Sequence, residues 1–306
     1  MIRLILTAAF ALATTAAAAA DAVTLTPGLV EGRSLRYDVA FTLERSLALG
    51  GGRDRLVQEA GLSLRIDSVD DEGVATITGG FEWVVIDLDR ASFRVRVDTR
   101  DIQGDSPNKA ETTIRELAGL YLESTFALRV AADGSVLEMT GLDPVVEFVG
   151  ATQGTLSRLA AGRFLPDNMA SDLEPIWHAD GAAGQSMSEG DSWTATRLSP
   201  LLGPISVKLE TPYRVTGAAE GLVVATGEVG ITMDLPEGIE MPITFEIADA
   251  SGSSTIEWDV ELGAVRSRDA TTNYTMILEA PDGKQGSQRS ARSVIEFVSS
   301  SDDAGR

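Results

Sequence analysis

Apolar and polar residues alternate along most of this 306-residue chain. The pattern is clearest in residues 35–43 and recurs at residues 62–66, 93–97, 126–130, 243–247, 256–260 and 274–278. Successive side chains of a β-strand point to opposite faces, so the alternation gives each strand one apolar face. Burial on one face is typical of antiparallel sheets, because parallel sheets are usually covered on both faces. The chain is therefore predicted to be mainly β, with antiparallel sheets.

One segment follows the helical period instead. Asp143 can cap a helix with Pro144 at its first position, and Gly162 and Pro166 can end it. The apolar stripe at i, i+3, i+4 and i+7 consists of Val145, Phe148, Val149, Thr152, Leu156 and Leu159. The spacing predicts one central amphipathic helix over residues 143–162, docked on the concave face of the sheet.

Two further segments are less regular. Residues 113–122 form a shorter and weaker helical pattern, and residues 166–190 have no clear period and predict an irregular connection. The small, polar residues 299–306 predict a disordered tail.

Three sequence cues occur twice in the same order. Residues 31–35 resemble 189–193, residues 71–76 resemble 219–224, and residues 124–128 resemble 254–258. Unrelated β-meanders also look alike, but the common order favours an internal duplication. We therefore expect a duplicated curved sheet or half-barrel. Its predicted parts are a signal peptide at 1–22, a first β half at 23–140, a helix and connection at 141–187, a second β half at 188–298 and the tail.

The first residues have the pattern of a secretory signal peptide. Arg3 precedes an apolar run at residues 4–12, and Ala18, Ala19 and Ala20 fit a cleavage site. The apolar run is shorter than the roughly 20 residues needed to span a bilayer. No later stretch has the composition of a transmembrane segment, so we expect the mature chain to be periplasmic or extracellular.

The composition disfavours several classes of function. The chain has 46 acidic and 25 basic residues, a formal net charge of −21, no cysteine and a single histidine. Nucleic-acid binding is not expected, because a phosphate backbone requires an excess of Lys and Arg. Disulfides and cysteine-ligated metals are excluded, and no cofactor is expected.

Catalytic motifs are scarce. The chain contains no G-x-S-x-G, H-E-x-x-H, P-loop or dinucleotide fingerprint. His178 is expected to be a surface residue rather than the base of a triad. Glu82, Asp87 and Asp89 surround Trp83 and could form a glycosidase carboxylate pair, but solvated strand faces are the favoured explanation in a chain with 46 acidic residues.

Other short patterns are weaker. Asp98, Asp101 and Asp105 do not meet the spacing of a calcium loop, so a cluster of turn residues is favoured. Asn273 lies in a glycosylation sequon inside an expected strand, which makes modification there a weak prediction.

The remaining feature is apolar. A curved sheet covered by an amphipathic helix can enclose a ligand cavity, although a filled core is the commoner outcome. The residues expected to line such a cavity are Phe126, Leu128, Val145, Phe148, Val149, Leu156 and Trp258.

An ordered set of short motifs runs through the middle of the chain. It comprises Leu117-Ala118-Gly119, residues 126–130, Asp133-Gly134-Ser135-Val136, Gly141-Leu142-Asp143, Pro175 and residues 189–193. The set resembles a family of bacterial secreted proteins and lipoproteins of unknown function, although this chain lacks the lipidated cysteine. In architecture, the chain looks like periplasmic lipoprotein carriers, which are half-barrels with a helical lid.

Three hypotheses of function follow. The first is an exported, non-enzymatic envelope protein that binds an apolar ligand or lipid between sheet and helix. The second is a purely structural or protein-binding module, and the third is a hydrolase with a carboxylate pair. The sequence names neither a ligand nor an oligomeric state.

Overall fold

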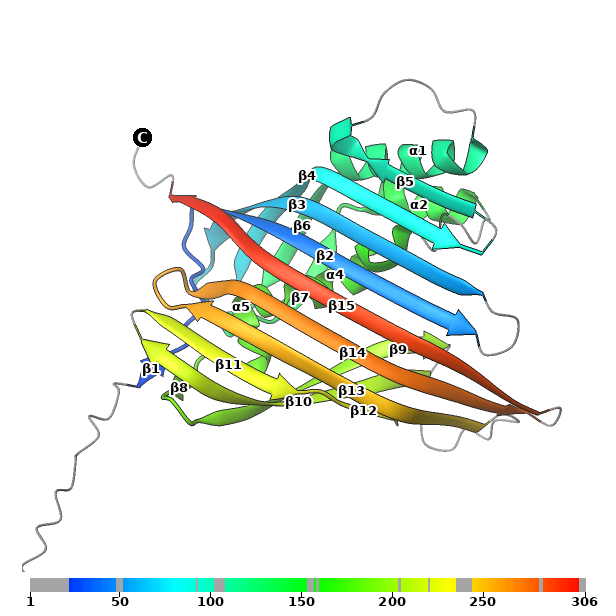
Figure 1. The fold of residues 1–306 in the computed structure, drawn as a ribbon. Helices are drawn as coiled ribbons and strands as arrows, with labels where there is room; N and C mark the ends of the chain where they lie inside the picture. Colours follow the sequence, from blue (N-terminus) through cyan, green and yellow to red (C-terminus); the bar gives the residue numbers. More distant parts are fainter. Residues whose placement is uncertain are drawn as a thin grey trace, which may run out of the picture.

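The fold is built around one open, curved antiparallel sheet of thirteen strands (Figure 1). The computed structural model describes residues 22–47, 52–91, 93–101, 108–152, 157, 160–202, 205–219, 221–234, 244–280 and 283–302. Within them, β1 (Val23–Thr24) and β8 (Ser186–Met187) form a separate two-stranded ribbon. The predicted mainly β, antiparallel fold is confirmed. The predicted signal peptide lies almost wholly outside the described residues.

The strands of the large sheet coincide with the alternating runs of the sequence. They are β2 (Arg33–Leu47), β3 (Arg53–Val69), β4 (Ala75–Arg90), β5 (Phe93–Asp98), β6 (Thr125–Val130), β7 (Val136–Thr140), β9 (Ser192–Leu202), β10 (Ile205–Ala219), β11 (Leu222–Glu228), β12 (Gly230–Asp234), β13 (Thr244–Asp259), β14 (Ala264–Ala280) and β15 (Gly283–Asp302).

The sheet runs β12-β10-β11-β13-β14-β15-β2-β3-β4-β6-β7, with β5 on β4 and β9 on β10. Two meanders therefore have the same neighbour order, β2-β3-β4-β6-β7 and β9-β10-β11-β13-β14. The repeated sequence cues fall at matching places in the two series. They lie at the first strand, at the turn after the second strand, and in the fourth strand.

The first and last long strands meet in the middle of the sheet. β15 pairs with β2 over nearly its whole length, from Ser287 opposite Leu47 to Asp302 opposite Arg33. Residues 299–302 therefore belong to a strand, so the predicted disorder is wrong for them, and residues 303–306 lie outside the described residues. The backbone pairs of β2 explain the difference, because they extend the ladder to the polar end of the chain.

Several helices, rather than one, lie on the sheet. They are α1 (Lys109–Glu123), α2 (Asp143–Ala151), α4 (Pro166–Leu173) and α5 (Pro175–His178), with short 3-10 turns η1 (Thr99–Asp101), η2 (Gly162–Phe164) and η3 (Ala179–Gly181). The segment predicted to be irregular thus contains α4, α5 and η3. The weak helical pattern at residues 113–122 is part of α1, whose first turn is capped by Asn108.

The helix predicted from residue 143 begins there but packs differently from the prediction. Pro144 lies in the first turn as expected, whereas the N-cap is Leu142 rather than Asp143. α2 packs chiefly on α1, and α1 in turn packs on β4 and β5. Val145 and Val149 are buried, whereas Phe148 is half-buried. The stripe of α2 therefore reaches the core mainly through α1.

The buried apolar residues fall into separate clusters. The main cluster contains the inner faces of β2, β3 and β4 with the helices, and it includes Tyr37, Leu62 and Phe126. A second cluster around Trp193 and Trp258 lies on the inner face of β9, β10, β11 and β13. Phe126 and Trp258 therefore belong to different clusters and do not form one continuous apolar lining.

Replacing Phe148 by alanine should cost less than the about 3–5 kcal/mol typical of a fully buried phenylalanine. The reason is that Phe148 is half-buried on α2, so its removal leaves a smaller cavity. Chemical denaturation measures the effect, with Phe126→Ala as the matched variant because Phe126 is 1% exposed. Equal losses for the two variants would contradict this placement of α2.

Candidate functional site

A helical segment, residues 160–181, covers one face of the large sheet and lines a pocket together with β2 and β15 (Figure 1). We call it the cover segment. It contains η2, α4, α5 and η3, and its apolar residues Phe164, Met169, Leu173, Ile176 and Trp177 belong to the main core. Polar side chains of the sheet fix it near both of its ends.

Gln58 of β3 fixes the start of the cover segment. It is fully buried, and its Nε2 donates hydrogen bonds of 3.0 Å to the carbonyls of Ala160 and Ala161. Its Oε1 accepts a hydrogen bond of 3.0 Å from the backbone N–H of Arg163. A Cβ on Gly162 would lie 2.6 Å from this oxygen, and Gly162 has a φ of +37°, so glycine suits both the contact and the backbone there.

Asp180 fixes the other end of the cover segment. Its carboxylate accepts hydrogen bonds from Arg268 Nε (3.0 Å), from Arg197 Nε (3.0 Å) and from the hydroxyl of Tyr213 (2.8 Å). Its backbone carbonyl accepts a hydrogen bond of 3.3 Å from the indole N–H of Trp193. These partners come from β14, β9 and β10, so one buried carboxylate joins the cover segment to three strands.

The charge of Asp180 is stabilised by this surrounding. Burial alone would raise its pKa, but Arg197 and Arg268 together with the hydrogen bond from Tyr213 outweigh it, and the pKa lies well below its usual range. The backbone of Asp180 has a φ of +52°, a left-handed conformation that is unfavourable for a residue with a Cβ. The hydrogen-bond network holds this conformation in place.

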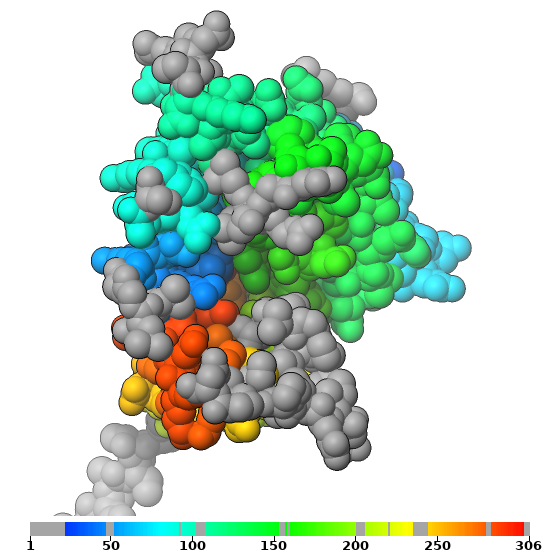
Figure 2. Space-filling model, turned by 90° about the vertical axis from the view of Figure 1, so that its right-hand side faces the viewer, coloured from blue at the N-terminus to red at the C-terminus, as the bar shows by residue number. Residues whose placement is uncertain are grey.

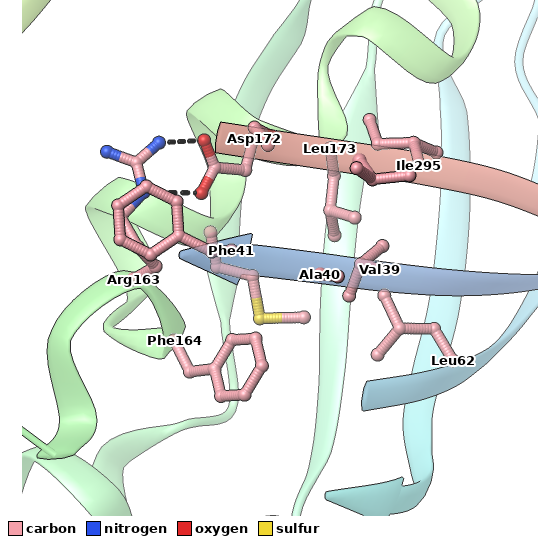
Figure 3. Close-up of a pocket in the computed structure, with 12 residues that line it drawn as sticks. Val39, Ala40, Phe41, Leu62, Arg163, Phe164, Asp172, Leu173 and Ile295 are labelled. Atoms are coloured by element: carbon pink, nitrogen blue, oxygen red, sulfur yellow. Dashed lines mark hydrogen bonds and ion pairs between the residues drawn. The ribbon is translucent and has the colours of Figure 1, made fainter. Parts of the chain in front are cut away.

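A pocket lies between the cover segment and the sheet (Figure 3). Its empty volume is about 380 Å³, counting the part that is open to solvent. The sheet contributes Val39, Phe41, Leu62 and Ile295, and the cover segment contributes Phe164, Met169 and Leu173.

One ion pair lies at the edge of this apolar lining. Arg163 donates to Asp172, with 2.7 Å between Nε and Oδ2, and both residues line the pocket (Figure 3). The guanidinium also stacks on Phe41, 4.9 Å from the ring centre. Burial lowers the pKa of Arg163 to about 10, with Arg197 and Arg268 adding to the effect. Arg163 is still charged at neutral pH.

Gln58 and Arg268, the sheet residues that fix the cover segment, lie directly beside residues that line the pocket. Gln58 is the register partner of Phe41, and Arg268 is the register partner of Ile295. Each anchor therefore lies directly beside a residue that lines the pocket. This arrangement places the pocket beneath the stretch of cover segment between its two fixed ends.

The residues predicted to line a cavity are divided by the structure. Phe126, Leu128, Val145 and Val149 are buried in the main cluster, and Phe148 packs against it. Trp258 belongs to the second cluster, and Leu156 lies outside the described residues. None of the described ones lines the pocket, which uses β2, β15 and the cover segment instead.

Two of the three carboxylates near Trp83 pair with arginines. Glu82 pairs with Arg36 at 2.9 Å, and the buried Asp87 pairs with Arg94 at 3.0 Å. The guanidinium of Arg100 covers the ring of Trp83, 4.1 Å from its centre. A sugar would have to displace this arginine before it could stack on that ring.

The other sequence candidates also have structural partners. Asp98 pairs with Arg100 at 2.8 Å, a contact that lowers its pKa, and Asp105 lies outside the described residues. Among the described residues, no group of acidic or histidine side chains is arranged to hold a metal ion. His178 lies in α5 with its Nδ1 3.6 Å from Glu174. Asn273 lies within β14, as expected.

Among the described residues, no helix has the length and apolar character that crossing a membrane requires. No protein-family model and no curated protein sequence matches the chain. The resemblance to a bacterial secreted and lipoprotein family therefore stays a prediction.

Three solved structures show limited similarity to the chain. A structure of lipovitellin aligns with 91% of this chain at 9% identity and a TM-score of 0.46, and the chain spans only 26% of it. The β domain of the Bordetella autotransporter BrkA aligns with 85% of the chain at 10% identity and a TM-score of 0.22, over 98% of its own length. OccK5 of Pseudomonas aeruginosa aligns with 87% at 6% identity and a TM-score of 0.25, over 98% of its own length. Similarity this low identifies neither a family nor a function for the chain.

Proposed function

We propose that the protein is an exported, non-enzymatic binder of an apolar ligand or lipid, held between the sheet and the cover segment. The observation that carries the proposal is the pocket lined by Val39, Phe41 and Leu62 on one side and by Phe164 and Leu173 on the other. The signal-like first residues support export to the periplasm or the medium.

The construction of the cover supports binding rather than simple core filling. Its ends are fixed by polar groups, Gln58 and the partners of Asp180, whereas the surface between them is apolar apart from the Arg163–Asp172 pair. These buried hydrogen bonds fix the position of the two ends of the cover segment. A displacement of either end would break them and leave a buried polar group without a partner, which is costly. The apolar surface between them can then exchange contacts with a ligand without loss of the anchors.

Solvent extraction of the purified protein, followed by mass spectrometry, tests the proposal. We expect a bound lipid or another apolar compound to be recovered, and we expect the stripped protein to gain thermal stability when it is added back, because ligands stabilise the state that binds them. A clean extract together with no stabilisation by added lipids would favour the structural or protein-binding alternative.

Replacing Val39 by tryptophan should fill the pocket and lower ligand content at least several-fold. Val39 lies on the inner face of β2 and lines the pocket, so a larger ring there occupies the space that a ligand needs. The matched control is Thr42→Trp, because Thr42 lies on the same strand but on the opposite face of the sheet. Mass spectrometry of extracts compares the two variants, and equal ligand content in both would contradict this location of the site.

A further inference from the structure

Two arginines face each other across neighbouring strands of the sheet. Arg45 of β2 is the register partner of Arg289 of β15. The register of β15 is regular from Ser287 to Phe297, so Arg289 shares a face with Ile295, which lies in the main core and lines the pocket. The arginine pair is therefore on the same inner face as the pocket.

The pair has no carboxylate partner among the described residues. Most described arginines do have one, as expected in a chain with 46 acidic residues. Arg292, three positions along β15, pairs with Asp269 at 2.7 Å. Like charges placed directly opposite each other in an antiparallel pair repel, so the Arg45–Arg289 arrangement is unfavourable on its own.

Two polar atoms, one in Arg289 itself and one in the neighbouring Ser287, are buried without a hydrogen-bond partner among the described residues. Within the described part of the chain, no group forms a hydrogen bond with Nε of Arg289 or with Oγ of Ser287. Ser287 is only 6% exposed and lies two positions from Arg289 on the same face of β15. A buried polar group without a partner is costly, and an anion that accepts from both groups would remove that cost.

The arginine pair and the pocket lie on one stripe of the sheet. Along β2 the inner face runs from Val39 through Phe41 and Leu43 to Arg45, which is exposed. At about 3.4 Å per residue, Arg45 lies about 20 Å along the strand from Val39. Figure 2 views the end of the molecule where β2 (blue) ends and β15 (red-orange) begins. The stripe thus leads from an apolar pocket to a pair of cations, of which Arg45 is exposed and Arg289 is partly buried.

We propose that Arg45, Arg289 and Ser287 bind the anionic head group of a single-chain amphiphile whose hydrocarbon chain occupies the pocket. This inference rests on the proposed function and names its ligand class. Guanidinium groups form short, charge-assisted hydrogen bonds with carboxylate and phosphate oxygens, and two of them can share one anion. Leu43 lies between the two parts and packs against the core, which provides the apolar path for the chain.

The test uses the full, delipidated protein and two probes, cis-parinaric acid and its methyl ester, at a pH where the acid is ionised. We expect the acid to bind at least about tenfold more tightly than the ester, the size of one charge-assisted hydrogen bond. Arg289→Met should reduce that difference, because Arg45 and Ser287 remain, and it should leave ester binding unchanged, because methionine keeps an apolar stem. Arg292→Met is the matched control and should change neither affinity.

Other results separate the two proposals. If the acid and the ester bind equally and Arg289→Met has no effect, the head-group site is wrong and apolar binding stands. If neither probe binds, the proposed function itself fails. If dodecyl phosphate binds no more tightly than inorganic phosphate, the site binds a free anion and the proposal of an amphiphile as the ligand is wrong. Ser287→Ala, a smaller change, repeats the measurement if Arg289→Met does not fold, and it should also weaken the acid more than the ester.

Discussion

Replacing Asp180 by asparagine is expected to destabilise the protein by about 3–5 kcal/mol, because it leaves buried arginine charge without a counterion. Arg268 is 6% exposed, and its Nε lies 3.0 Å from the carboxylate. The same change weakens the hold of Arg197 and Tyr213 on the cover segment. Chemical denaturation followed by tryptophan fluorescence measures the loss.

The control is Asp302→Asn. Asp302 pairs with Arg33 at 3.0 Å, but its side chain is 53% exposed, so its removal should cost less than about 1 kcal/mol. Both substitutions remove a carboxylate that pairs with arginine, so their difference compares a buried network with an exposed ion pair. Similar losses in the two variants would show that the Asp180 network does not hold the fold.

The same carboxylate sets a pH dependence. The folded-state pKa of Asp180 is depressed, so its contribution is fully present above the unfolded-state pKa of about 3.9 and is lost as pH falls below it. Stability of the unmodified protein should therefore decline in acid more steeply than that of Asp180→Asn.

The sequence predicts most of the sheet because alternation is a local property. The runs at residues 35–43, 62–66, 93–97 and 126–130 all fall within strands, and one-sided burial follows directly from the pleat. The need for a cover also follows, since the apolar face must be buried against something else.

The cover segment is harder to foresee from the sequence. α5 has 4 residues and α4 has 8, too few for a helical period to stand out. A usable signal was present in the sheet instead. Gln58 and Arg268 occupy inward-facing positions of β3 and β14 where the alternation would place an apolar residue. A polar residue at such a position indicates a buried hydrogen-bond partner.

The pocket depends on a pairing that no local pattern contains. β2 and β15 lie at opposite ends of the chain, yet they place Val39 beside Ile295 and Arg45 beside Arg289. Such contacts are set by topology and register over the whole sheet. The described residues of the predicted lining are therefore not among those that line this pocket, and the prediction of a site between sheet and helix is kept in the proposal.

Trp177 should be the most sensitive aromatic position of the cover segment. It is fully buried in the main core, and α5, which carries it, packs on β14. The turn between β6 and β7 also lies against it, because a Cβ on Gly134 would be 2.3 Å from the carbonyl oxygen of Trp177. Trp177→Ala is therefore expected to lose about 3–5 kcal/mol of unfolding free energy, the usual cost of a large buried aromatic.

Trp177→Phe separates the packing of the ring from its polar atom. Among the described residues nothing accepts a hydrogen bond from Nε1 of Trp177, so replacing the indole by a phenyl ring removes an unsatisfied donor as well as some volume. We expect a clearly smaller loss than for alanine. Denaturation curves compare the two variants. Wild-type stability in Trp177→Ala would mean that the cover segment opens independently of the sheet, and ligand release would then need no unfolding of the core.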